Sequence, residues 1–448
     1  MTNKVEDFAA NPRKALWTLA FPVVIAMIVQ VMYNIVDTAF VGRLGVEAIA
    51  ALTFAFPIFF ILIALNSGIG TGMGSRISRS LGEKDLEGAE NAAMHGLFIS
   101  IVLAVIVFAL GIIFIKPMFS VFGASNDVLE LSIEYMGIVL FGILFMFPSF
   151  AMNSILSAQG DTKTPMKVQI SALVLNIILD LIFIYVLGYG VRGAAIATVI
   201  SFLFGLVLFS YFIRRKSHLK LELRAFRFSP SITKQIMAVA APSSLMMILI
   251  SIYVIFLNRY MVPFGTEYVA SFGLVSRLES VAFLPIVAVS VSLLTLVGMF
   301  FGAKKSELLK STIMYAIKAS VLFTSAIGLV FFIFPRLFLR IFTSDAVLLD
   351  IASKYLRIEL FILPTIAVAM IISRALQGMG FGMPGLTINI VRTVLIPVPL
   401  AYIFVFILNY GYLSVAVAMI IGGIIANAVA ILWLNNCFKT KLNKKQIN

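Results

Sequence analysis

The chain has little charge and few residues suited to metal or redox chemistry. Of its 448 residues only 12% are charged, against about 25% in soluble proteins. The single cysteine, Cys437, excludes a disulfide within the chain. The two histidines, His95 and His218, have no metal-ligand spacing such as HExxH, and no serine or cysteine stands in a nucleophile motif such as GxSxG. These absences argue against a soluble protein and against an enzyme.

Long apolar runs are abundant instead. Hydrophobic residues make up 61% of the chain, and twelve runs come close to or exceed the roughly 20 residues that a helix needs to cross a bilayer. The runs lie at about 14–39, 49–74, 89–115, 130–156, 166–187, 192–213, 233–260, 268–298, 309–334, 348–376, 386–408 and 412–437. The predicted fold class is all-α, a polytopic membrane protein of about twelve transmembrane helices.

The basic residues are distributed unevenly along the chain. The formal net charge is +14, and most of the 34 lysines and arginines fall in segments on one side of the membrane, above all in 214–234. Because cytoplasmic loops are enriched in Lys and Arg, we predict a multi-pass protein of the cell membrane with both termini in the cytoplasm. Membrane lipids, and not nucleic acid, are the expected partners of this basic surface. The first span is long and has no small-residue cleavage site, so no removable signal peptide is expected.

The two halves of the chain echo each other at a constant spacing. AFPVVIAMI matches AAPSSLMMI and GVEAIAAL matches GTEYVASF, and the same spacing separates Pro22 from Pro242 and Gly45 from Gly265. Repeats of six spans share one orientation, which predicts two parallel six-helix lobes with substrate between them. We expect an N-terminal lobe at 1–213, a cytoplasmic linker at 214–232 and a C-terminal lobe at 233–448. A duplicated membrane scaffold without transport activity is the simpler alternative.

Two aspartates interrupt the apolar runs of the first half. Asp37 lies in VMYNIVDTAFVGRLG and Asp180 in LNIILDLIFIYVLG, and nothing acidic stands at the matching places of the second half. A carboxylate in the middle of a membrane helix costs roughly 2.5 to 3.5 kcal/mol, so it normally faces a bundle interior or a watery cavity and handles ions or protons. The alternative, a capping or hydrated residue near a helix end, is stronger for Asp37 than for Asp180, which has apolar neighbours on both sides.

Other polar residues share a helix face with these aspartates, because they are three or four positions away. The two faces carry Gln30, Tyr33 and Asp37, and Asn176 and Asp180. Thr198 and Asn153 are the nearest candidates on neighbouring spans. Such an oxygen-rich set suits a hard cation or one proton shared between the carboxyl groups. The expected coupling ion is therefore a proton or a hard cation, and no other cofactor is expected.

A few further residues leave two interpretations open. Pro22 and Pro242 each remove a helical hydrogen bond within a span, which permits either a gating kink or a static bend. Glu279, two positions after Arg277, is either ion-paired inside the bundle or neutralised near a helix end. Arg392 either lines a cavity or extends to the membrane interface.

Taken together, these segments resemble the MATE (multidrug and toxic compound extrusion) family. The resemblance rests on twelve spans in two sixes and on MYNIVDTAFVGRLGVEAIAAL, ILSAQGDTKTPM and NIILDLIFIYVLGYGVRGAAIATVIS, and it covers nearly the whole chain. It implies an antiporter that exports small organic cations and other amphipathic drugs in exchange for protons or sodium ions. RLESVAFLP in the eighth span and the lack of an acidic residue inside the seventh bring the chain closer to the DinF-like than to the NorM-like branch.

The resemblance also assigns roles to residues of this chain. The implied ion-coupling residues, which could hold Na⁺, are Asp37, Asn176, Asp180 and Thr198. The implied polar pocket contains Gln30, Tyr33 and Asn153, and Pro22 matches a proline at which the helix bends. We expect a monomer. The alternative function is a flippase for lipid-linked precursors, since related folds move lipids and a basic inner surface can hold a phosphate head group; the acidic character of the predicted site argues against it.

Overall fold

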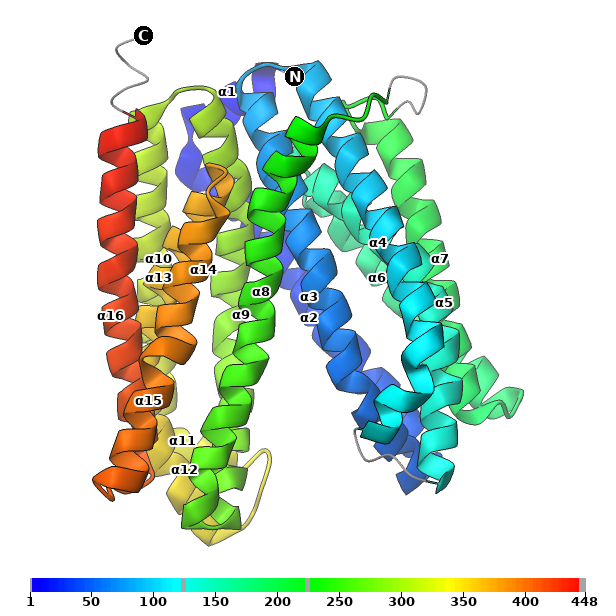
Figure 1. Ribbon diagram of the computed structural model, residues 1–448, viewed down its shortest axis with the longest axis vertical. Helices are drawn as coiled ribbons and strands as arrows, with labels where there is room; N and C mark the ends of the chain where they lie inside the picture. The colour runs from blue at the N-terminus through cyan, green and yellow to red at the C-terminus, as the bar shows by residue number, and fades with distance from the viewer. Residues whose placement is uncertain (1, 122–125, 222–225, 443–448) are drawn as a thin grey trace. The chain divides into compact units, whose positions relative to one another are not determined.

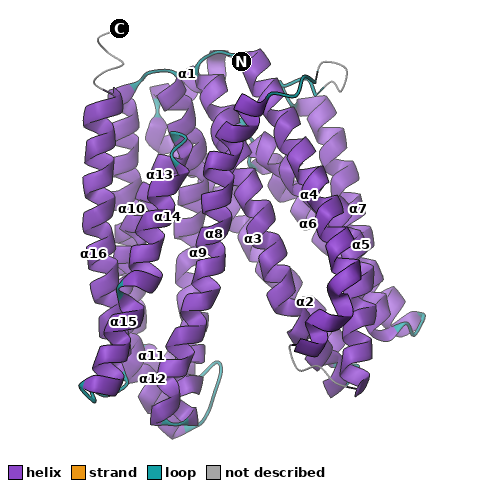
Figure 2. Cartoon of the chain, viewed as in Figure 1, coloured by secondary structure: helices purple, strands orange, loops and turns teal. Residues whose placement is uncertain are grey.

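The computed structural model describes residues 2–121, 126–221 and 226–442, and the secondary structure in these ranges is helical. Figure 2 shows helices joined by short loops, without a strand in the described ranges. Eleven of the described helices are long and apolar enough to cross a membrane, and the number is twelve if one bent pair counts as a single span. The prediction of an all-α protein with about twelve membrane helices is confirmed.

Two compact units make up the chain, one at residues 21–241 and the other at 2–20 and 242–448. The first residues of α2 therefore belong to unit 2, and the first residues of α8 belong to unit 1. The sequence predicted two lobes separated by a linker at 214–232. That division stays a prediction, and the units defined by packing are used below. Each unit is described below by itself.

Unit 1 is a bundle around α5, which packs against α3, α4 and α7 (Figure 1). Its helices are α2 (Pro12–Gly42, from Phe21 onward), α3 (Val46–Gly82), α4 (Leu86–Val121), α5 (Asn126–Ala158), α6 (Lys163–Asp180), the π-helical segment η1 (Leu181–Val186) and α7 (Gly190–Lys216). The core contains Phe119, Tyr135 and Phe147, each at most 4% exposed. Many apolar side chains on the outer faces, such as Val105 and Ile113, are exposed, as expected for surfaces that face lipid.

Unit 2 is built around α9 and α13, which pack against each other and both against α10. Its helices are α1 (Thr2–Ala10), α8 (Pro230–Met261, from Pro242 onward), η3 (Val262–Phe264), α9 (Thr266–Gly302), α10 (Ser306–Ile333), α11 (Pro335–Leu339), α12 (Ala346–Glu359), α13 (Ile362–Gly378), α14 (Gly382–Ile390), η4 (Val391–Leu395), α15 (Pro397–Tyr402), η5 (Ile403–Ile407), α16 (Leu413–Cys437) and η6 (Phe438–Leu442). The tenth predicted span is broken, because α12 and α13 meet at an angle of 46°.

The sequence repeat is also a repeat of backbone conformation. Gly45 and Gly265, which precede α3 and α9, have φ values of 128° and 122°. Side chains other than glycine rarely adopt this conformation, which explains why both positions are glycine. Lys84 and Lys304 follow the same two helices, again at the repeat spacing, with left-handed φ values of 61° and 56°. The two halves therefore begin and end their second long helix in the same way.

A repeat-related pair of residues anchors a chain segment in each unit. In unit 1 the fully buried imidazole of His95 accepts a hydrogen bond at Nε2 from the backbone N–H of Ser229, at 2.7 Å, just before α8. In unit 2 the matching position, Tyr315, accepts a hydrogen bond from Nε1 of Trp17 at 2.9 Å. Since a backbone N–H can only donate, His95 carries its proton on Nδ1, which lies 2.8 Å from the carbonyl oxygen of Asn91.

Candidate ion site in unit 1

Asp180 is the last residue of α6 and lies directly before the π-helical segment η1. Its side chain is 0% exposed, and neither carboxyl oxygen has a hydrogen-bond partner in the described part of the chain. Asn176, one turn earlier, is likewise 0% exposed with both polar side-chain atoms unpartnered. Buried polar atoms in proteins nearly always have a partner, and π-helical turns occur frequently at functional sites. The pair therefore has the properties of a site that receives a ligand.

Tyr33 connects α2 to α7 at this point. Its hydroxyl donates a hydrogen bond of 3.3 Å to Oγ1 of Thr198, which is 4% exposed. The carboxylates of both Asp37 and Asp180 lie close enough to Tyr33 to interact with it electrostatically. Three helices thus bring a phenol, a hydroxyl and two carboxyl groups into one cluster.

Asp37 completes the cluster from α2. One of its carboxyl oxygens is buried and unpartnered, and its charge acts on Asp180. Two buried carboxylates that repel each other favour the uptake of a positive charge, either a proton or a metal cation. Neutral oxygens lie nearby, because Asn176 is one turn before Asp180 on α6 and Tyr33 is hydrogen-bonded to Thr198. The structure therefore brings together Asp37, Asn176, Asp180, Thr198 and Tyr33.

Other residues of the predicted set lie apart from this cluster or have local partners. Gln30 is exposed, and the side chain of Asn153 accepts a hydrogen bond from Ser157 on its own helix, at 3.3 Å. Pro22 is buried and α2 continues through it. The roles of Gln30 and Asn153 in a polar pocket, and of Pro22 in a bend, stay predictions.

Tyr135 on α5 is a member of the cluster that the sequence did not indicate. It is 4% exposed and interacts electrostatically with Asp37, Tyr33 and Asp180. A tyrosine within an apolar span gives no local signal, because tyrosine is also common in ordinary cores. Its counterpart in the second repeat, Tyr355, would have been the only sequence clue.

Unit 2 holds the two charged residues whose role the sequence left open. Arg392 lies in η4 and acts electrostatically on Glu279 of α9, although no ion pair joins them in the described part of the chain. A further acidic residue, Glu359 at the end of α12, interacts with Glu279 and is 2% exposed. The sequence analysis did not single out Glu359.

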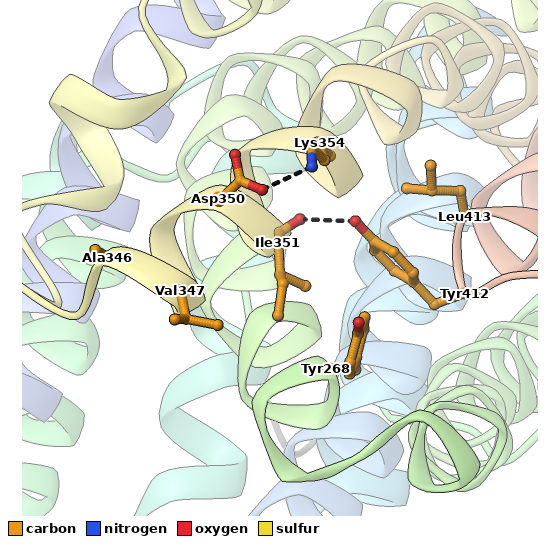
Figure 3. Close-up of a pocket in the computed structure, with 8 residues that line it drawn as sticks. All are labelled: Tyr268, Ala346, Val347, Asp350, Ile351, Lys354, Tyr412 and Leu413. Atoms are coloured by element: carbon orange, nitrogen blue, oxygen red, sulfur yellow. Dashed lines mark hydrogen bonds and ion pairs between the residues drawn. The ribbon is translucent and has the colours of Figure 1, made fainter.

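A pocket of about 660 Å³ lies elsewhere in unit 2 and coincides with none of the predicted site residues. Figure 3 shows Asp350 turned toward Lys354, with Tyr268 and Tyr412 beside them. Asp350 is already paired with Lys354 at 2.7 Å and with Arg336 at 3.2 Å. Burial, assisted by Tyr268 and Asp350, raises the pKa of Tyr412, so its phenol remains neutral. The carboxylate of this pocket is thus occupied by basic partners.

Comparison with known proteins agrees with this architecture. The MatE family model matches residues 22–182 and 242–403, once in each half. A protein named “FAD transporter” from Shewanella oneidensis is 29% identical over 395 residues, covering 87% of each chain. “Probable multidrug resistance protein YoeA” from Bacillus subtilis is 27% identical over 435 residues, covering 95% of this chain and 93% of the relative. The crystal structure titled “Crystal structure of MATE in the bent conformation” superposes with a TM-score of 0.94 at 32% identity, covering 99% of each chain.

A duplicated bundle of membrane helices with buried, unpartnered carboxyl groups defines a multi-pass membrane transporter. The same family model matches both repeats at corresponding positions, which identifies the transporter family. The chain belongs to the MATE family of transporters.

Proposed function

We propose that the protein is a multidrug efflux antiporter that exports amphipathic organic compounds in exchange for H⁺ or Na⁺ bound at the unit 1 cluster. The observation that carries this proposal is the complete burial of Asp180 with both carboxyl oxygens unpartnered. A buried carboxylate without a partner is costly, and an incoming cation or proton removes that cost. The names of relatives such as YoeA support drugs as the exported compounds.

Exchange follows from competition between ion and drug. A ligand shifts a conformational equilibrium only by its difference in affinity for the two states. Ion binding between α2, α6 and α7 favours one arrangement of these helices, and bound drug favours the other. One net charge that moves down a potential of 100 mV supplies about 2.3 kcal/mol, which is available when a neutral compound is exported; exchange of one organic cation for one H⁺ or Na⁺ is electroneutral and draws on the concentration gradient of the ion.

The available oxygens suit either coupling ion. Asp37 and Asp180 offer carboxylates, Asn176 an amide oxygen, and Thr198 and Tyr33 hydroxyl oxygens, which are the ligand types of a hard cation. No group of three or more His, Cys, Asp or Glu residues that could hold a metal is present among the described residues. Sodium is proposed as a transported ion, with the proton as the other candidate for the same oxygens.

The test uses the full chain in proteoliposomes with ethidium as the organic cation. An imposed pH gradient and an imposed sodium gradient are applied one at a time, and ethidium movement is followed by fluorescence. We expect one of them to drive transport and Asp180→Asn to abolish it. Asp7→Asn, the same substitution at an exposed position of α1, should leave transport unchanged.

Transport under neither gradient, or full transport by Asp180→Asn, would refute the proposal. FAD in place of ethidium tests the substrate named for the Shewanella relative, and translocation of a labelled lipid-linked precursor in the same vesicles tests the flippase alternative. Reporter fusions at each end of the chain would test the proposed cytoplasmic location of both termini in the cell membrane.

A further inference from the structure

One imidazole holds the chain segment that precedes α8. The segment is residues 226–229, and α8 begins at Pro230. His95 on α4 is 0% exposed, and its Nε2 accepts a hydrogen bond of 2.7 Å from the backbone N–H of Ser229. Its Nδ1 lies 2.8 Å from the carbonyl oxygen of Asn91, which can only accept. Both ring nitrogens are therefore committed, Nδ1 as a donor and Nε2 as an acceptor.

Two aromatic side chains of the segment cover the imidazole. Phe226 lies 4.9 Å and Phe228 5.6 Å from the ring of His95, measured between ring centroids. Phe98 of α4 contacts the same two phenyl rings at 5.7 Å and 6.4 Å. Phe228 is itself 59% exposed, so it forms the outer side of this aromatic cluster. Displacement of the segment would therefore open the imidazole to water.

The same segment sets the start of α8. The carbonyl oxygen of Ser229 accepts hydrogen bonds from the backbone N–H and the hydroxyl of Thr233, both at 3.1 Å. Ser229 is thus joined to His95 through its N–H and to the first turn of α8 through its carbonyl group. The first residues of α8 belong to unit 1 and the others to unit 2. A change at Ser229 therefore acts on a helix that contributes to both units.

The charged residues around His95 come from three elements. A Cβ atom on Gly96 would lie 2.8 Å or less from three atoms of the Met73 side chain, so His95 is level with this part of α3. The charged residues near this level are Arg76, Arg79 and Glu83 on α3, Glu87 and Glu90 on α4, and Arg227 in the segment. Helix α5 also packs against α4, but its charged residues are confined to its first turns, at the opposite end of the pair.

The acidic residues of this set are exposed or have other partners. Glu90 accepts a hydrogen bond of 2.8 Å from the backbone N–H of Lys220, and Glu83 lies 3.8 Å from Arg76. Glu87 is exposed. No ion pair joins His95 to an acidic side chain in the described part of the chain. A positive charge on the covered imidazole would therefore be buried without a counter-charge in contact, which is unfavourable.

Protonation changes what the imidazole can bind. Histidine is the side chain that ordinarily changes its charge between about pH 5 and 8, and the added proton would go to Nε2. The ring then donates at both nitrogens and faces the N–H of Ser229, a second donor, so this hydrogen bond is lost. Attraction of the cation to the phenyl faces does not restore an acceptor for Ser229. The released segment lets water reach the charged ring, so the proton favours the released state.

We propose that His95 is a pH-sensitive anchor, which holds residues 226–229 against α4 when neutral and releases them when it is protonated at Nε2. The anchor is intact at the higher pH and is lost as the pH falls on this side of the membrane, where the sequence predicts the cytoplasm. Release frees Ser229 and loosens the first turn of α8. The corresponding anchor of unit 2 accepts through the phenol of Tyr315, so the two repeats differ in their response to pH.

The test follows a spin label at position 227, which is exposed, in the full chain in lipid vesicles. The parent variant combines Arg227→Cys with Cys437→Ser, so that the label has one attachment site. We expect its EPR spectrum to gain a mobile component as the pH is lowered through the range in which histidine titrates, and to lose it when the pH is restored. His95→Gln offers an amide oxygen as acceptor without a titrating group and should abolish this response. His218→Gln, the same substitution at the other, exposed histidine, should retain it.

A second measurement keeps the test informative if His95→Gln does not fold. In the His218→Gln protein His95 is the sole histidine, so histidine-selective NMR reports its tautomer and its charge directly. We expect a proton on Nδ1 alone at neutral pH, and a midpoint of protonation that coincides with the midpoint of the change in label mobility. The proposal is overturned if the label does not respond to pH, if its response occurs while His95 stays neutral, or if His95→Gln responds like the parent. Because neither readout needs transport, failure of the exchange experiments would refute the proposed function without deciding this anchor.

Discussion

The two units share helix order, turn glycines and a pair of tyrosines, yet they carry their buried acidic residues on different helices. In unit 1 the carboxyl groups of Asp37 and Asp180 come from α2 and α6 and interact electrostatically with Tyr33, which is hydrogen-bonded to Thr198. In unit 2 they come from α9 and α12, where Arg392 acts on Glu279 and the hydroxyl of Tyr355 is directed to the sulfur of Met419. A duplicated bundle thus preserves the scaffold of a buried charge site while its two copies diverge in chemistry.

The largest expected effect comes from placing an acidic residue at the unit 2 position that corresponds to Asp37 at the repeat spacing. Leu257→Asp puts an unpaired carboxyl group at a fully buried position of unit 2 and should cost about 3–5 kcal/mol of unfolding free energy. Asp37→Leu, the reverse change, should keep or increase stability while it abolishes transport. Thermal unfolding of the purified variants checks both, with Leu257→Met as the control. Equal destabilisation by the two changes would contradict the comparison.

A smaller effect is expected at the anchors of the two units. His95→Ala removes the acceptor for the backbone N–H of Ser229 and the ring contacts with Phe226 and Phe228, so it should cost roughly 2–4 kcal/mol. Tyr315→Phe removes one hydrogen bond and keeps the ring, and should cost about 1 kcal/mol. Thermal unfolding measures both. Equal losses of unfolding free energy for His95→Ala and Tyr315→Phe would contradict the expected difference between the two anchors.

The tyrosines offer a finer comparison within the sites. Tyr33→Phe removes the hydrogen bond to Thr198, a change of about 0.5–1.5 kcal/mol. That corresponds to as much as about a tenfold shift in the ion concentration for half-maximal transport. Tyr253→Phe, the change at the corresponding position of unit 2 at the repeat spacing, should shift it by about twofold or less, because the proposed coupling ion binds in unit 1. Ion-concentration curves in proteoliposomes distinguish the two, and larger shifts for Tyr253→Phe would reverse the assignment.

The smallest effect is expected at exposed ion pairs. Arg192 pairs with Glu134 in unit 1, and Lys354 with Asp350 in unit 2. Such pairs contribute about 0–1 kcal/mol, so Glu134→Gln and Lys354→Gln should each lower the unfolding free energy by no more than that. Lys354→Gln leaves Asp350 its pair with Arg336. Losses that shrink as salt is added, measured by thermal unfolding, would show that the pairs act electrostatically.

The sequence was sufficient to predict the helices, the repeat and the unit 1 acids, because each leaves a local signal. Asp180 stands out among apolar neighbours, and the spacing from Asn176 places both on one face. Glu359 gave no such signal. It follows Arg357 by two positions, so the end of α12 resembles an ordinary charged helix end, and only packing against other helices buries it. Tyr135 was missed for a related reason, since its partners come from α2 and α6.

The indole of Trp17 has a practical consequence. The chain has two tryptophans, and both Trp17 and Trp433 belong to unit 2. Trp17 is hydrogen-bonded to Tyr315 and lies 5.3 Å from the ring of Phe323, measured between ring centroids. Intrinsic emission of the unlabelled protein is therefore an optical signal from one half of the molecule, and it can report on ligands added to that half without any engineered probe.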